Sequence, residues 1–104
     1  MIKHIVMWQL KDYAEGADKA ANVLKMKALL ESCKELVPGL QTLEVGVAET
    51  GLEATCDIVL YTEFTDAHAL DAYQAHPHYV AMKPFIGAVR ETRLCMDYLL
   101  PNPL

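Results

Sequence analysis

The sequence is short of positive charge. Nine lysine and arginine residues stand against fourteen acidic ones, the net charge is −5, and no run of basic residues occurs. Nucleic acid and anionic membrane surfaces are therefore poor partners, because proteins bind both through clustered positive charge. This composition does not exclude binding of a small anionic ligand.

Several chemical signatures are also missing. Three cysteines (Cys33, Cys56 and Cys95) show neither CxxC nor Cys/His metal spacing, which favours packed, reduced thiols and no metal site. No nucleotide, flavin, haem or Walker-type motif occurs, so we expect no cofactor. The first residues lack a signal-peptide leader, and no apolar run approaches the length of a membrane span. We therefore expect a cytoplasmic protein that does not bind membranes.

The residues that are present predict one folded domain spanning 1–104. The chain is 53% hydrophobic and 22% charged, which suits a single core. Apolar residues that alternate predict strands, and apolar residues three or four positions apart predict helices. In chain order, the predicted elements are strand 2–10, helix 17–36, strand 40–49, strand 56–64, helix 65–76 and strand 91–100.

Prolines and glycines mark the breaks between these elements. Pro38 and Gly39 are expected to stop the first helix, because proline cannot continue it and glycine tolerates the turn. Residues 78–89 are expected to form an irregular helical segment interrupted by Pro84, and 101–104 a tail.

This order of elements is typical of a ferredoxin-like α+β sandwich, with a four-stranded antiparallel sheet and both helices on one sheet face. The other face would then be open and strongly apolar. The residues expected on it are Ile5, Met7, Leu43, Val45, Val47, Val59, Tyr61, Cys95 and Leu99. Such a surface is too apolar for a monomer, so we expect a homodimer that pairs its two sheet faces.

Four segments together resemble the stress-responsive A/B barrel domain family, also called dimeric α/β barrels. They are "IKHIVMWQLK", "VPGLQTLEVG", "DIVLYTEFTDAHALDAYQAHPHYV" and "CMDYLL", which span nearly the whole chain. The resemblance implies a ferredoxin-like protomer and a dimer whose two sheets form one barrel. It also implies a cleft between the sheet and the helices.

One plant member of that family is a polyketide cyclase, and its motif can be compared position by position. Its first-strand histidine corresponds to His4, and its helix-end tyrosine to Tyr73. The following histidine and proline correspond to His76 and Pro77. The cyclase's catalytic histidine position is occupied by Tyr79 here, with a histidine one place earlier at 78.

These residues suggest a catalytic hypothesis. Aldol chemistry needs a base and a donor to the developing enolate oxygen; a histidine suits the first role and a tyrosine hydroxyl the second. His4 is the candidate base, and Tyr73 and Tyr79 are candidate donors. The candidate ligand-binding residues are Trp8, which shares the strand face of His4, and His76 and His78 at the helix end.

Structural roles compete with each of these assignments. His4 on an apolar strand could be a hydrogen-bonded core histidine, and Tyr73 could serve packing alone. His76 could bond free carbonyls at a helix end, and His78 could be exposed. Three classes of function stay open: a dimeric binder of a small carbonyl-rich or aromatic ligand, a small cofactor-free enzyme (a cyclase or an oxygenase), and a structural oligomer.

Overall fold

The computed structural model describes residues 1–101. Six strands and four helices follow one another along the chain. They are β1 (Ile2–Leu10), β2 (Tyr13–Ala14), β3 (Ala17–Asp18), α1 (Lys19–Glu31), β4 (Leu40–Val47), β5 (Ile58–Phe64), α2 (Ala67–Ala75), α3 (Pro77–Val80), α4 (Lys83–Val89) and β6 (Arg90–Leu99). Only the first residue of the expected tail at 101–104 lies within the described residues.

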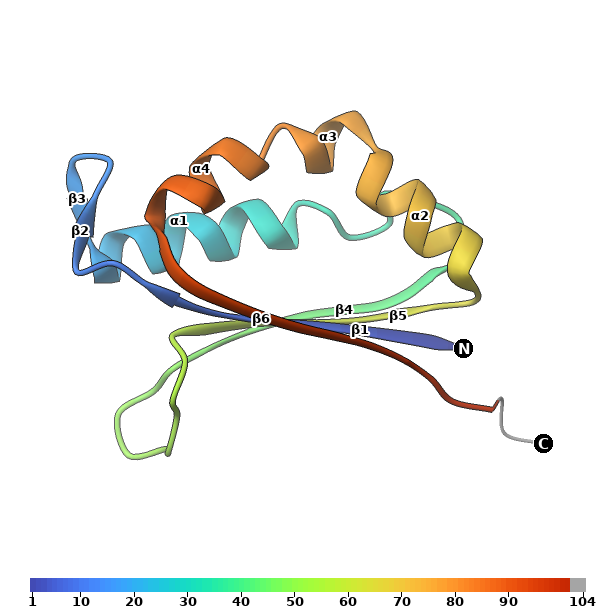
Figure 1. Cartoon of the computed structure of the whole chain (residues 1–104), viewed down its shortest axis with the longest axis horizontal. Helices are drawn as coiled ribbons and strands as arrows, with labels where there is room; N and C mark the ends of the chain where they lie inside the picture. Colours follow the sequence, from blue (N-terminus) through green and yellow to red (C-terminus); the bar gives the residue numbers. More distant parts are fainter. Residues whose placement is uncertain (102–104) are drawn as a thin grey trace.

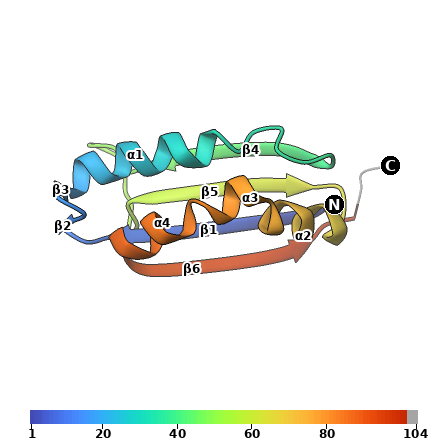
Figure 2. The ribbon, with the colours of Figure 1, turned by 90° about the horizontal axis from the view of Figure 1, so that it is seen from above.

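The predicted fold is confirmed. Four strands form one antiparallel sheet in the order β4-β5-β1-β6, and all four helices lie on the same side of it (Figure 1). Seen from above, α1 lies over β4 and α4 lies over β1 (Figure 2). The core fills the space between the two layers, as the ferredoxin-like arrangement requires.

Strand β1 is the centre of this core. Its alternating residues Val6, Trp8 and Leu10 are buried against the helices, as the period-two pattern predicts. β5 lies on one side of β1 and β6 on the other. β1 therefore carries its side chains into the middle of the interlayer space.

The open face of the sheet differs from the prediction on β4. In the register, Leu43 and Val45 lie opposite Thr62 and Leu60, whose side chains are buried under the helices. Leu43, Val45 and, by the same alternation, Val47 therefore face the core, and placing them on the open face was wrong. Apolar alternation marks two faces but does not say which one the helices cover.

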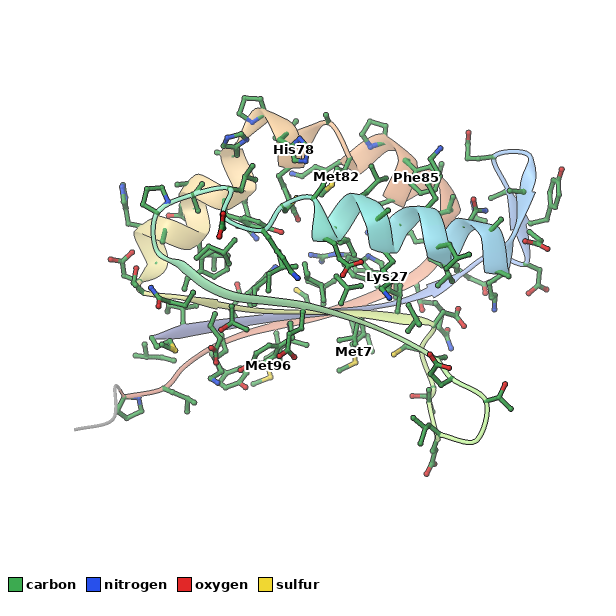
Figure 3. The ribbon with its side chains drawn as sticks, turned by 180° about the vertical axis from the view of Figure 1, so that it is seen from behind. Met7, Lys27, His78, Met82, Phe85 and Met96 are labelled. Carbon is green, nitrogen blue, oxygen red and sulfur yellow. The ribbon has the colours of Figure 1, made fainter. Side chains whose placement is uncertain are left out.

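The prediction was also wrong for two residues of β6. Cys95 lies opposite Val6, and Leu99 lies opposite Ile2, so both belong to the helix side of this edge strand. The open face instead carries Leu94 and Met96 of β6. Apolar residues on β1, β5 and β6 make up the open apolar face, which we define as Ile5, Met7, Val59, Leu94 and Met96. Met7 and Met96 point away from the helix layer in Figure 3.

Helix α1 is shorter than predicted at both ends. A two-stranded hairpin, β2–β3, precedes it, and the Asp18 side chain caps it by accepting from the Ala21 amide at 2.9 Å. It ends at Glu31 rather than 36, because tighter turns follow and Glu35 has φ 62°. Gly39 comes later, where a Cβ would lie 2.6 Å from the Thr65 hydroxyl.

Two prolines begin helices in the second half of the chain. Pro77 occupies the first turn of α3, and Pro84 occupies the first turn of α4. Both positions suit proline, since the first amides of a helix have no partner in the helix. The expectation that Pro84 interrupts a helix was therefore wrong. Helix α2 is capped by Asp66, whose side chain accepts from the Ala69 amide at 2.9 Å.

Candidate functional site

A cavity of about 370 Å³ lies between the sheet and the helices α1, α3 and α4. Its apolar wall is built from all of these elements. It consists of Trp8 from β1, Leu30 from α1, Tyr79 from α3, Ile86 from α4, and Met82 from the link between α3 and α4. The cavity size falls in the range of about 300–1,000 Å³ that is usual for small-molecule sites.

The rest of the lining is polar and includes three cations. Lys83 belongs to α4, Arg90 ends it, and Arg93 lies on β6 directly opposite Trp8. Gln74 contributes a side-chain amide from α2. No acidic residue lines the cavity among residues 1–101. A ligand here would therefore meet hydrogen-bond donors more often than acceptors.

Trp8 combines an apolar wall with an unused donor. The side chain is buried, and its indole Nε1 has no hydrogen-bond partner among the described residues. A buried N–H without a partner costs about 1–3 kcal/mol. Trp8 lines the cavity, so a ligand acceptor that bonds this N–H would remove that cost.

Three aromatic rings lead from the cavity into the core. The Tyr79 ring lies 4.8 Å from the Tyr73 ring, and Tyr73 lies 5.3 Å from Phe64, as measured between ring centroids. Tyr73 is fully buried, and its hydroxyl lies near the weakly polar Cys33 thiol, with no well-formed hydrogen bond among residues 1–101. Tyr73 and Tyr79, two of the three candidate catalytic residues, are thus in contact.

Both tyrosines stay protonated at neutral pH. Burial raises the pKa of Tyr73 far above its ordinary value, and the nearby Cys33 and Tyr79 raise it further. Burial also raises the pKa of Tyr79, although the charge of Arg93 acts in the opposite direction. Both hydroxyls are therefore suited to donate hydrogen bonds and not to act as bases.

His4 is buried on the helix side of β1 and is held by a carboxylate. Its Nδ1 bonds Oδ1 of Asp97, which lies directly opposite on β6. The Thr62 hydroxyl also donates to the His4 carbonyl oxygen at 2.8 Å. Because a carboxylate only accepts, Nδ1 carries a proton, and Nε2 is the ring nitrogen that would hold the lone pair of a neutral imidazole. That Nε2 has no partner among the described residues.

His76 and His78 hold helix ends together. The His76 ring caps α3 by accepting from the His78 amide at 3.1 Å. The His78 ring lies 2.8 Å from the Ser32 hydroxyl just after α1, and it belongs to the helix layer (Figure 3). Neither histidine is among the residues that line the cavity, nor are His4 and Tyr73.

Trp8 and Tyr79 are therefore the two sequence-predicted site residues that line the cavity. Sequence reasoning missed Lys83, Arg90 and Arg93, which no local motif distinguishes from solvated surface cations. It also missed that Asp97 orients His4, because the pairing depends on the β1–β6 register. No group of three or more His, Cys, Asp or Glu side chains within residues 1–101 could hold a metal ion.

Comparisons with known proteins identify a matching family and similar solved structures. The family model for the stress responsive A/B barrel domain matches residues 2–100. No curated protein matches the chain. A dimeric ferredoxin-like protein of unknown function from Bacteroides fragilis shares 29% identity and a TM-score of 0.79, with 95% of each chain covered.

Two further solved structures share the fold at lower identity. A protein of the A/B barrel domain family from Mesorhizobium loti is 21% identical to this chain, with a TM-score of 0.67 and 97% of each chain covered. A putative antibiotic biosynthesis monooxygenase from Nitrosomonas europaea is 20% identical with a TM-score of 0.70, over 94% of this chain and 96% of that one. No helix within residues 1–101 is long and apolar enough to cross a membrane.

Proposed function

Because the chain belongs to the stress responsive A/B barrel domain family, we propose that it is a cytoplasmic homodimer that binds a small carbonyl-rich or aromatic ligand in the cavity. The observation that carries the proposal is a cavity with an apolar wall that includes Trp8, whose buried Nε1 has no hydrogen-bond partner within residues 1–101. Flat ligands suit the aromatic faces of Trp8 and Tyr79. A carbonyl oxygen suits the indole N–H.

The open apolar face supports the dimer. Its residues Met7, Leu94 and Met96 are 41%, 71% and 64% exposed in the single chain. Covering about 400 Å² of apolar surface would contribute roughly 10 kcal/mol before the cost of association. The similar protein from Bacteroides fragilis is described as dimeric. In such a dimer the cavity stays on the outer, helix-covered side of the sheet.

A thermal-shift screen with flat phenolic and β-keto compounds tests the binding function. A ligand at 100 times its Kd should stabilise the fold by about 2.7 kcal/mol, which a melting curve resolves easily. Trp8→Phe keeps the aromatic wall but removes the indole donor, so it should reduce the shift. Glu53→Gln, on an exposed loop, is the matched control and should leave the shift unchanged.

Two results of that screen would count against the proposal. If no compound raises the melting temperature, the result favours the alternative hypothesis, that the protein is a structural oligomer without a ligand. If shifts occur but Trp8→Phe and Glu53→Gln behave alike, the ligand binds outside the cavity.

A second candidate function is cofactor-free catalysis by His4 and Tyr73. The specific observation in its favour is that Asp97 holds His4 while leaving Nε2 without a partner. Nε2 would take an acidic α-proton from a β-keto substrate, and a tyrosine hydroxyl would donate to the resulting enolate oxygen. The substrate would have to reach beyond the cavity lining, since neither His4 nor Tyr73 is part of it.

Turnover measurements separate catalysis from binding. In the catalytic reading, a β-keto compound that stabilises the protein is consumed, and His4→Ala abolishes its consumption while ligand binding persists. A bound compound that stays intact under the wild-type protein argues for binding alone. The wild type and His4→Ala should be compared across a range of pH, since general-base catalysis depends on the protonation state of the base.

A further inference from the structure

Three of the chain's nine cationic residues line the same cavity. The chain has nine lysines and arginines against fourteen acidic residues, yet Lys83, Arg90 and Arg93 all line one cavity that contains no acidic side chain in the described part of the chain. The cavity is therefore locally positive in a protein of net charge −5. Such a site favours anions, because the local field and not the net charge acts on a bound ligand.

A β-bulge places the two arginines on the same side of the sheet. Arg90 and Arg93 are three positions apart, so an ordinary strand would turn them to opposite faces. The β1–β6 register shifts between Gln9 and Leu10, so that Leu10 lies opposite Arg90 while Trp8 lies opposite Arg93. The extra residue is taken up between Arg90 and Thr92, and both arginines face the helix side. Bulges commonly re-aim side chains in this way next to functional sites.

These cations have no internal counter-charge. Neither Arg90 nor Arg93 forms an ion pair within residues 1–101, and all four ion pairs there involve other residues. Lys83 places its Nζ 5.6 Å from the centre of the Tyr79 ring. The three cations therefore line the same cavity as the aromatic residues, and those uncharged rings leave their charge in place.

We propose that the ligand of this cavity is an organic acid, with an aromatic or carbonyl-rich body against Trp8 and Tyr79 and a carboxylate held by Arg90 and Arg93. The proposal rests on the proposed ligand-binding function and narrows its ligand class. A guanidinium matches a carboxylate in shape and binds it through two parallel hydrogen bonds. The indole N–H of Trp8 would donate to a second oxygen of the ligand.

Isothermal titration calorimetry with two probes of matched shape tests the charge requirement. 1-Naphthoate carries the carboxylate, and 1-naphthamide is its neutral counterpart. The wild-type protein should bind 1-naphthoate at least about tenfold more tightly than 1-naphthamide, since hydrogen bonds to charged groups are the stronger ones. The preference should shrink as salt is raised from 0.05 to 0.5 M, because exposed charges are screened.

Charge-removing variants locate the effect. The double variant Arg90→Gln/Arg93→Gln should bind the acid and the amide about equally. Lys27→Gln removes a cation that does not line the cavity, and it should retain the preference for the acid. Both arginines are exposed, so a circular dichroism melt should show that the double variant folds like the wild type.

The possible outcomes distinguish this inference from the binding function beneath it. If the acid and the amide bind the wild type equally, the organic-acid inference is overturned while binding in the cavity stands. If neither probe binds, the organic-acid inference and the proposed ligand-binding function are both contradicted. If inorganic phosphate displaces 1-naphthoate at equal concentration, the carboxylate is replaced by a phosphate as the preferred anion, and the inference is again overturned.

Discussion

The two sides of the sheet differ in whether their polar side chains have hydrogen-bond partners within residues 1–101. On the helix side, His4 and Trp8 are buried with one ring nitrogen each unpartnered among residues 1–101, and Tyr73 above them has an unpartnered hydroxyl. On the open side, the Lys3 ammonium donates to the Tyr61 hydroxyl at 2.5 Å and to the Glu63 carboxylate at 2.6 Å.

This difference indicates what each side contacts. A polar group left unpartnered in a core is costly, and native folds keep few of them, mostly at sites of function. Of these three residues only Trp8 lines the cavity, where the proposed ligand would bond its indole N–H, whereas His4 and Tyr73 do not line it. On the open side, Lys3, Tyr61 and Glu63 are hydrogen-bonded to one another within one protomer, so a second sheet could cover this cluster without leaving its charges unpaired.

The largest effect should come from the buried aromatic ring of Tyr73. We expect Tyr73→Ala to lower the free energy of unfolding by about 3–5 kcal/mol, since it empties a core position. Tyr73→Phe keeps the ring and removes only the unpartnered hydroxyl, so it should cost less than about 0.5 kcal/mol. Urea unfolding of both variants is the measurement. A loss above about 1.5 kcal/mol in Tyr73→Phe would mean that the hydroxyl has a partner.

The next effect concerns the open apolar face. Met96→Asp should convert a dimer into a monomer, because each interface would then bury two unpaired carboxylates at a cost of several kcal/mol. Light scattering at micromolar concentration measures the mass directly. Leu52→Asp adds the same charge on an exposed loop and should leave the dimer intact. A wild-type monomer at that concentration would refute the sheet-face pairing.

A smaller effect should follow from separating His4 and Asp97. Asp97→Ala leaves the buried Nδ1 of His4 without its acceptor, which should cost about 1–3 kcal/mol in the free energy of unfolding. In a His4→Ala background the same change should cost far less, and a double-mutant cycle of urea melts measures the coupling. Equal costs in the two backgrounds would show that the pair contributes no coupling.

The smallest effect should be a pH dependence from the open side. The hydrogen bond from Lys3, together with the one from the Tyr61 hydroxyl, lowers the pKa of Glu63 to about 2. Since the folded pKa lies below the unfolded one, the stabilisation is complete above about pH 4.5 and is lost as the pH falls towards 2. The melting temperature of the wild type should therefore exceed that of Glu63→Gln at pH 6, and the difference should shrink below pH 4.5 and vanish only as the pH falls through about 2. A constant difference would contradict the assignment.

Local sequence patterns predict much of the fold, but they predict less of the candidate site. Strand β1 is confirmed over residues 2–10, because its alternation is strong and uninterrupted. The faces of β4 and β6 were partly misassigned, because apolar alternation marks two faces of a strand without saying which one the helices cover. At the site, Trp8 and Tyr79 are predicted residues that line the cavity, whereas His4 and Tyr73 lie deeper.

The sequence by itself determined the order of strands and helices and the stripes that form the core, because periodicity and caps act over a few neighbouring residues. Only the tertiary structure decided which side chains meet. His4 and Asp97 are 93 positions apart and pair because β1 and β6 are neighbours in register. Arg90 and Arg93 share a side with Trp8 because a bulge in β6 re-phases the strand there, a consequence of the sheet and not of either arginine's neighbours in the chain.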